Sequence, residues 1–173
     1  MPSTFSRILC ALLCIGIGLS ACAPTRVINS SIPFDADVAS IIWDEGTGTI
    51  VGQAFLRQRG GGVVTCAGEM VTLVPMTDHA RDRFRQIYGS EQGGFVSVYT
   101  NIDDVSGRDI TYASFVRTAQ CDAAGSFEFQ NVADGEYYVT TRVVWQVGYT
   151  LEGGSLAARV RVADGETAQI LLN

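Results

Sequence analysis

Apolar and polar positions alternate with a period of two in several segments of this 173-residue chain. The clearest segment runs from residue 136 to 146, where five side chains fall on one side: Tyr137, Val139, Thr141, Val143 and Trp145. Successive side chains of a β-strand point to opposite faces of the sheet. This alternation therefore predicts a long strand with one buried face.

Similar patterns predict seven further strands, at 49–57, 69–75, 95–99, 111–120, 126–129, 155–162 and 167–172. Turn residues separate them, as in Asp122-Ala123-Ala124-Gly125 and Ala133-Asp134-Gly135, where aspartate accepts backbone hydrogen bonds and glycine takes a positive φ. We interpret the last two strands as a closing hairpin around 163–166. Seven or eight short strands with turns at close intervals predict an all-β, antiparallel sandwich.

One short helix is predicted near 78–88. Phe84, Ile87 and Tyr88 share one side at helical spacing, and Thr77 or Asp78 can cap the first turn. Gly89 stands where a left-handed C-terminal cap residue belongs. The segment is long enough for about three turns.

The beginning of the chain indicates export from the cytoplasm. Arg7 precedes an apolar run at 8–19 that is too short to span a bilayer comfortably, which is typical of a secretory signal. The following Leu19-Ser20-Ala21-Cys22 resembles the lipobox of bacterial lipoproteins, although an ordinary small-residue cleavage site is the alternative. The resemblance implies a lipid on Cys22, and Ala23 after it implies the outer membrane, with the domain facing the periplasm or the cell surface.

These features divide the chain into a signal peptide at 1–21, a tether at 22–46 and one domain at 47–173. The apolar Ile41-Ile42-Trp43 would either pack onto the domain or form a first short strand. Cys66 and Cys121 are the cysteines left after the signal and the lipidation site. Outside the cytoplasm such a pair is a disulfide candidate, and two buried free cysteines are the alternative.

The charge balance excludes some partners. The sequence has 12 cationic residues, all arginine, against 18 acidic ones, and losing Arg7 with the signal leaves a net charge of −7. This surplus of negative charge disfavours nucleic acid and electrostatic binding to anionic lipid surfaces.

The pattern D-x-x-G-x-F-x-F-x-x-V-x-x-G-x-Y-x-V from Asp122 to Val139 resembles the carboxypeptidase regulatory-like domain. Residues 48–54 and 67–73 are similar to the first two strands of that family. The resemblance implies an Ig-like or transthyretin-like β-sandwich without catalytic residues, and it covers 47–76 and 111–173. Segment 77–110 departs from the family and is interpreted as an insertion that carries the helix.

No pattern in the sequence indicates catalysis, a metal or another cofactor. His79 is the single histidine, and we expect it to be solvated at the start of the helix. The acidic turn with Asp103, Asp104 and Asp109 does not match the spacing of a calcium loop. The glycines at 60–62 lack the lysine and the serine or threonine that a phosphate loop requires.

Three hypotheses remain for the function. The first is a non-enzymatic, membrane-anchored structural or protein-binding module of the cell envelope, and the last is a minor hydrolase. The second is a carbohydrate-binding module, for which exposure of two or more coplanar aromatic rings would be the sign. Its candidate stacking residues are Trp43, Tyr99, Tyr112, Trp145 and Tyr149, with core packing as the alternative use of these rings.

Overall fold

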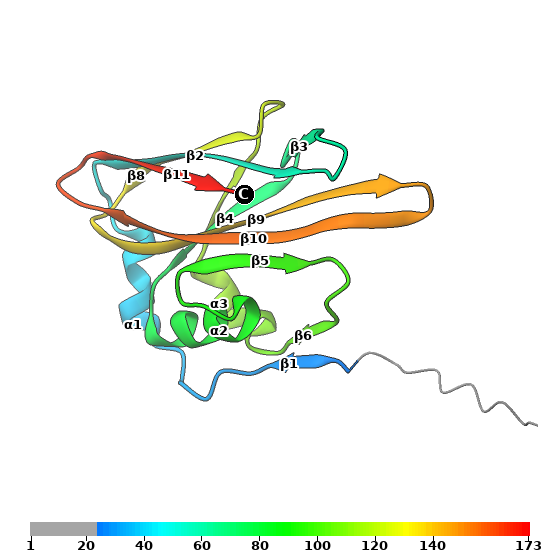
Figure 1. The fold of residues 1–173 in the computed structure, drawn as a ribbon. Helices are drawn as coiled ribbons and strands as arrows, with labels where there is room; N and C mark the ends of the chain where they lie inside the picture. Colours follow the sequence, from blue (N-terminus) through cyan, green and yellow to red (C-terminus); the bar gives the residue numbers. More distant parts are fainter. Residues whose placement is uncertain (1–23) are drawn as a thin grey trace, which may run out of the picture.

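The computed structural model describes residues 24–173, which form two packed β-sheets and a layer of helices on the outer face of one sheet (Figure 1). This confirms the predicted all-β sandwich class. The predicted signal peptide and the lipidation site Cys22 lie outside the described residues. Among the described helices, none is long and apolar enough to cross a membrane.

The larger sheet has five strands, and all of its neighbouring pairs are antiparallel. In spatial order they are β5 (Gly93–Ser97), β10 (Thr150–Val162), β9 (Gly135–Val147), β4 (Met70–Pro75) and β7 (Arg117–Gln120). Strand β9 is therefore central: β10 pairs with it from Gly135 to Val147, and β4 pairs with its other edge from Tyr137 to Thr140. It coincides closely with the predicted strand at 136–146.

The facing sheet is built around β2 (Gly48–Arg57). Strand β2 lies between β8 (Ser126–Val132) and β11 (Thr167–Leu172), and its last residues pair with β3 (Val63–Thr65). The pairing of β2 with β11 is parallel. The predicted hairpin of the last two strands is thus wrong, because β10 and β11 belong to opposite sheets.

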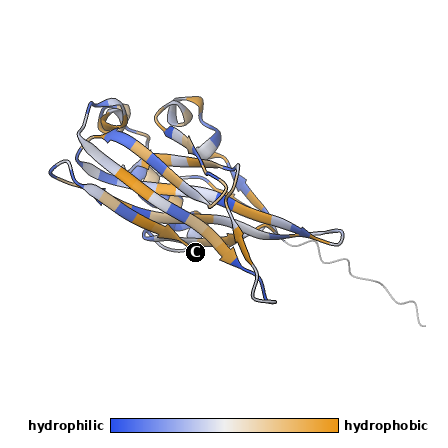
Figure 2. Ribbon diagram, turned by 90° about the horizontal axis from the view of Figure 1, so that it is seen from above, coloured by the Kyte–Doolittle hydropathy of each residue, from blue (hydrophilic) through white to orange (hydrophobic). Residues whose placement is uncertain are grey.

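The main core lies between the two sheets. The odd-numbered side chains of β9 from Tyr137 to Val143 point into it and are at most 3% exposed, as the alternation predicts. Phe127 and Phe129 enter from β8 in the facing sheet and are also buried. Figure 2 shows the corresponding change of blue and orange along the strands.

The helical layer covers the outer face of the larger sheet (Figure 1). Its main element is α2 (Asp78–Tyr88), which Thr77 caps through the Ala80 amide and which ends at Gly89 with φ 76°, as predicted. The Phe84 ring stacks on the Tyr138 ring of β9 at a centroid distance of 4.0 Å. Burial raises the pKa of the Tyr138 hydroxyl to about 12, and this hydroxyl donates to the Glu91 carbonyl.

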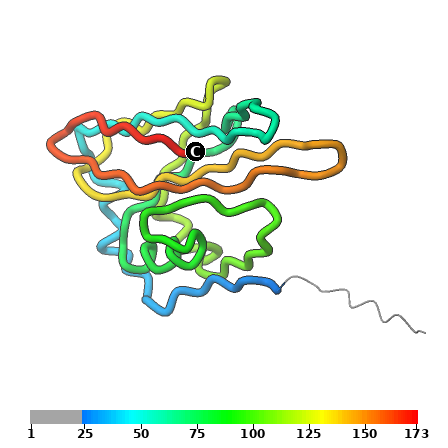
Figure 3. The backbone as a smooth tube through the Cα atoms, viewed as in Figure 1, coloured from blue at the N-terminus to red at the C-terminus, as the bar shows by residue number. Residues whose placement is uncertain are grey.

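The segment expected to be a tether is packed onto the domain from β1 (Arg26–Ile28) onward. Strand β1 pairs with β6 (Ile102–Asp104), and Ile28 is fully buried. Helices α1 (Ala36–Ala39) and η1 (Ser40–Trp43) follow, and Ile42 of η1 is 2% exposed. Figure 3 shows that this part of the chain runs along one end of the sandwich, from the helical layer to the facing sheet. Burial of Ile28 and Ile42 explains why the segment packs instead of remaining extended.

Segment 77–110 is integrated into the fold rather than looped out. It supplies α2, the edge strand β5, strand β6 and the short helix η2 (Ser106–Arg108). Arg83 of α2 donates from Nε to both carboxylate oxygens of Asp104 and from a terminal nitrogen to the Tyr112 hydroxyl. Because these polar groups satisfy each other, replacing residues 90–109 by a short linker would remove Asp104 and leave Arg83 without its carboxylate partner.

Two further predictions are wrong. Residues 111–120 do not form one strand, because α3 (Ile110–Ser114) precedes β7, and Asp109 caps α3 through the amides of Thr111 and Tyr112. The strand predicted at 155–162 starts too late, because Gly153 and Gly154 already lie inside β10. A Cβ at Gly154 would stand 2.0 Å from the Val96 carbonyl oxygen, so this glycine permits close approach of β5.

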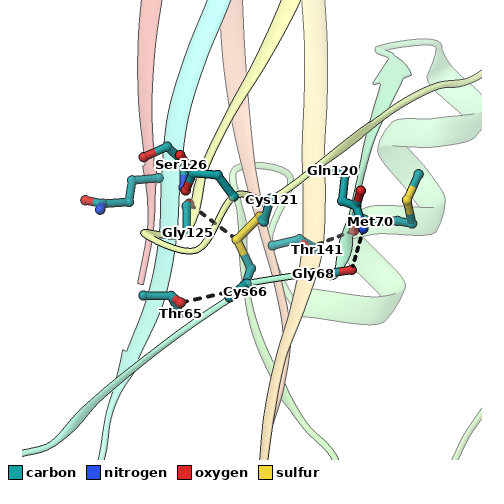
Figure 4. The surroundings of a disulfide bond; sticks show 12 residues. Thr65, Cys66, Gly68, Met70, Gln120, Cys121, Gly125, Ser126 and Thr141 are labelled. Carbon is teal, nitrogen blue, oxygen red and sulfur yellow. Dashed lines mark hydrogen bonds between the residues drawn. A yellow bond between two sulfur atoms is a disulfide. The ribbon is translucent and has the colours of Figure 1, made fainter.

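Cys66 and Cys121 form a disulfide, with their Cα atoms 5.8 Å apart (Figure 4). Cys66 follows β3 and Cys121 follows β7, so the bond joins the two sheets. Nearby, the Thr141 hydroxyl of β9 donates to the Met70 carbonyl of β4. The bond therefore lies near the part of β9 that precedes Trp145.

Candidate functional site

At one end of the sandwich the two sheets leave an open cavity of about 520 Å³, which we call the mouth. This volume is within the range of small-molecule sites. Four different segments contribute to its wall: the loop after β2, the turn after β5, the end of β9 and the start of β10. The lining residues are Gln58, Arg59, Gly60, Tyr99, Trp145, Val147 and Glu152.

Trp145 is at the mouth because the alternation of β9 continues past the end of the covering sheet. It belongs to the same side of the strand as Tyr137 and Val143, and it packs partly against the main core. A Cβ at Gly153 would stand 2.8 Å from the Trp145 ring, so this glycine makes room for the indole. The predicted inward orientation of Trp145 is correct, and the ring is nevertheless only partly buried.

Tyr99 forms the side of the mouth and is 59% exposed. The Val98 amide donates to the Gly153 carbonyl, which fixes this turn against β10. The Tyr99 hydroxyl donates to Oε1 of Glu152 at 3.3 Å, and Glu152 lies directly opposite Trp145 in the β9–β10 pair. Partial desolvation and the Glu152 carboxylate raise the pKa of the Tyr99 hydroxyl. A tyrosine hydroxyl is protonated at neutral pH even at its ordinary pKa, so it acts as a donor here.

Polar groups from the β2–β3 loop complete the mouth. The loop is held by the Gln58 amide, which donates to the Gly62 carbonyl, and by the Gly61 amide, which donates to the Gln58 carbonyl. Gly61 has φ 87°, a conformation that favours glycine. Arg59 and Gln58 thus bring hydrogen-bond donors to a wall that already holds aromatic rings and a carboxylate.

The other candidate aromatic residues lie elsewhere. Tyr112 is 5% exposed and accepts from Arg83, so it is a core residue. Trp43 is 57% exposed but belongs to η1, at the opposite end of the molecule. Tyr149 is fully exposed at the tip of the β9–β10 hairpin and does not line the mouth. The structure therefore brings together Tyr99 and Trp145.

His79 is buried, contrary to the expectation of a solvated residue. It is 8% exposed, Nδ1 lies 2.7 Å from the Ile32 carbonyl oxygen, and its ring packs near Phe34 and Tyr112. Aromatic residues of the N-terminal segment and α3 cover it because these segments fold back over α2. This position assigns the histidine to the packing of the helical layer.

The acidic turn has structural roles. Asp104 accepts hydrogen bonds from Arg83, and Asp103 forms a salt bridge with Arg108 at an N–O distance of 2.5 Å. Asp109 caps α3. Within residues 24–173 no group of three or more metal-ligating side chains is close enough to hold an ion. These carboxylates therefore serve contacts within the protein.

A second and broader hollow, of about 740 Å³, crosses the surface of β2 and β8. Glutamine and acidic side chains line much of it, and its aromatic residue, Phe127, is 5% exposed. A ligand there would meet polar groups without an accessible ring face. The mouth combines both kinds of contact and is the better candidate site.

No family model matches the chain, and no curated protein matches it either. Among solved structures, one similar chain is that of a “putative carbohydrate binding protein” from Pseudomonas aeruginosa. It is 24% identical with a TM-score of 0.65, over 82% of this chain and 97% of that chain. The alignment covers a larger fraction of this chain than residues 47–173 make up. The common fold therefore includes part of the N-terminal segment. This likeness establishes the fold.

The sequence indicated the two rings of the mouth but not its polar residues. Tyr99 and Trp145 were among the predicted stacking candidates, whereas Gln58, Arg59 and Glu152 were not singled out. The strand predicted at 155–162 starts after Glu152, and this late start concealed the position of Glu152 opposite Trp145. Recognising Thr150–Val162 as a strand antiparallel to β9 would have revealed that pair.

Proposed function

We propose that this protein is a lipid-anchored, non-enzymatic protein of the bacterial cell envelope that binds carbohydrate in the mouth of its sandwich. The observation that carries the proposal is the presence of Tyr99 and Trp145 in one cavity with Glu152 and Arg59. Sugar rings have apolar faces that pack on aromatic rings, and hydroxyl groups that need both donors and acceptors. The mouth offers each of these contacts.

The structure leads us to favour the second sequence hypothesis, a carbohydrate-binding module, over the first, a structural or protein-binding module. A protein-binding role would most readily use the polar surface of segment 77–110, which the resemblance to the carboxypeptidase regulatory-like domain does not cover. Several of its charged groups are paired internally, as in Arg83 with Asp104, Arg85 with Asp82 and Arg108 with Asp103. A charged side chain that is already paired contributes less to the binding of a partner, because its existing contact must first be broken.

The name of the similar Pseudomonas protein is consistent with carbohydrate binding and adds support. The lipid anchor rests on Leu19-Ser20-Ala21-Cys22, and its placement in the outer membrane rests on Ala23. Kinship with the carboxypeptidase regulatory-like domain is likewise proposed from the motif at 122–139. The absence of catalytic chemistry is proposed because the sequence patterns and the mouth do not combine a nucleophile with a base.

Binding to a panel of soluble saccharides tests the proposal. For the best ligand, we expect Tyr99→Ala to weaken affinity about tenfold, which corresponds to ~1.4 kcal/mol. Tyr99 is largely exposed, so this variant should fold normally. Trp145→Ala should weaken affinity further, with circular dichroism as the check on its folding.

Trp43→Ala is the matched control, because Trp43 is similarly exposed but lies away from the mouth. It should bind like the parent protein. Equal affinity of parent and Tyr99→Ala, or failure of every saccharide in the panel to bind, would contradict the proposed function.

A further inference from the structure

The tip of the β9–β10 hairpin exposes three large apolar side chains within a short stretch of sequence, on both faces of the hairpin. Tyr149 is fully exposed, Val147 is 56% exposed and Leu151 is 50% exposed. No charged residue occurs from Val143 to Leu151. A run of exposed apolar residues at a protruding tip marks a surface that meets a partner or a membrane, whereas exposed apolar residues that occur singly need no such explanation.

The described chain begins at the same end of the molecule as this tip. Asn101 donates from its side chain to the Thr25 hydroxyl at 2.7 Å, just before β1. Asn101 is close in sequence to Tyr99, which contacts Glu152 of β10. Figures 1 and 2, which view the molecule from two directions, both show the start of β1 and the hairpin extending toward the same side.

The chain between the proposed anchor and the domain is short. Cys22 precedes Thr25 by three residues, and a fully extended chain of that length spans about 10 Å. The hairpin extends past the Trp145–Glu152 pair by two further pairs, Gln146 with Leu151 and Val147 with Thr150, and then the turn. That extension is also about 10 Å. A bilayer that holds a lipid on Cys22 is therefore within reach of Tyr149.

We infer that the tip formed by Val147, Tyr149 and Leu151 docks into the surface of the bilayer that carries the anchor. This inference rests on the proposed lipidation of Cys22. Tyrosine suits the boundary between headgroups and acyl chains, because its ring is apolar and its hydroxyl is polar. The contact is apolar rather than electrostatic, in keeping with the acidic balance of the chain. Docking also brings the mouth, which begins at Val147, close to sugars carried on lipid headgroups.

Tryptophan fluorescence in the acylated full-length protein tests the docking. The protein is reconstituted into phosphatidylcholine vesicles with or without brominated acyl chains, which quench indoles that penetrate the bilayer. The reporter is Tyr149→Trp in a W43F/W145F background. We expect about twofold or stronger quenching together with a blue shift, since the new indole would lie at the membrane interface.

Two single-tryptophan variants accompany the reporter. W145F retains Trp43 at the opposite end and should show no quenching. W43F retains Trp145, which should show weaker quenching than the tip reporter because Trp145 lies farther along β9. Adding Leu151→Ser and Val147→Ser to the reporter should reduce its quenching.

Flotation of the same vesicles separates the two claims. If the protein floats and the tip reporter is quenched while Trp43 is not, docking is supported. If the protein floats and the reporter is as unquenched as Trp43, docking is overturned while the anchor stands. If the protein does not float, the anchor and the docking are both overturned, and carbohydrate binding by the mouth is still tested by its own assay.

Discussion

The two ends of the sandwich differ in how the space between the sheets is closed. At the end near η1, Ile42, Val132 and Val162 are at most 2% exposed and fill it. The Tyr137 hydroxyl donates to the Ala133 carbonyl, so even the polar atom of this core side chain is satisfied. At the other end Trp145 is only partly covered, and the hairpin continues into solvent.

The difference shows that one pattern serves two purposes. Tyr137 and Trp145 lie on the same face of the same strand, yet one completes the core and the other lines a cavity. At the closed end, side-chain packing holds the sheets together. Toward the mouth, the Cys66–Cys121 bond supplies a covalent connection between them. The open end can therefore keep its cavity without filling it.

Removal of the disulfide should have the largest effect. We expect Cys66→Ala with Cys121→Ala to lower the free energy of unfolding by on the order of 4 kcal/mol, because the bond closes a long loop in the unfolded chain. Urea denaturation measures this change. Saccharide binding should also weaken, since the sheets near the mouth are no longer tied together.

Thiol labelling of the unreduced, denatured protein supplies the check on the bond itself. The protein should show no label at Cys66 or Cys121. Two labelled thiols, or a double variant as stable as the parent, would mean that side-chain packing, and not the disulfide, holds the two sheets together at both ends.

Truncation of the closed end should come next. Ile42→Ala is expected to lower the free energy of unfolding by roughly 3 kcal/mol, because it leaves a cavity where a buried side chain stood. Saccharide affinity at the mouth should remain unchanged. The neighbouring Trp43→Ala, at an exposed position, should change stability by less than about 0.5 kcal/mol. A similar loss in both variants would show that η1 does not seal this end.

A smaller effect is expected at Asp82, which ties the N-terminal segment to α2 on its way from the open to the closed end. Asp82 accepts from the Ser30 hydroxyl at 2.9 Å and from the Gln86 amide at 2.8 Å, and it pairs with Arg85. Burial tends to raise the pKa of this carboxyl, but these hydrogen bonds outweigh it and lower the pKa. Asp82→Asn should reduce stability at neutral pH by about 1 kcal/mol.

The pH dependence of this effect follows from the sign of the shift. A lowered pKa in the folded state stabilises the protein above the unfolded-state pKa of an aspartate, near 4, and the stabilisation is lost as the pH falls through the folded-state value. The difference in the free energy of unfolding between the parent and Asp82→Asn, measured by urea denaturation, should therefore become smaller between pH 7 and pH 3. Asp78→Asn on the same helix is the control, because that side chain is 78% exposed. If this difference in the free energy of unfolding stayed constant across the pH range, the ionised carboxylate of Asp82 would not be the cause of the stabilisation.

The local pattern of the sequence determined much of the framework. The alternation in 136–146 and the two phenylalanines of β8 predicted strands and their buried faces correctly, and the cap residues predicted α2. These features depend on neighbours within a few positions, so they can be recognised without knowing the fold. Cys66 and Cys121 were identified as a candidate pair, although their meeting depends on two different sheets.

The tertiary structure decided what each predicted face meets. The predicted strand at 155–162 leaves out Gly153 and Gly154, but in β10 these glycines make room for Trp145 and for β5. The N-terminal segment lacked a clear period, yet burial of Ile28 and Ile42 packs it onto the domain. Alternation along β9 shows which side a residue faces and not where the opposing sheet ends. The sequence by itself therefore determined that Tyr137 and Trp145 share a face, and only the packing of the two sheets decided that one lies in the core and the other at the mouth.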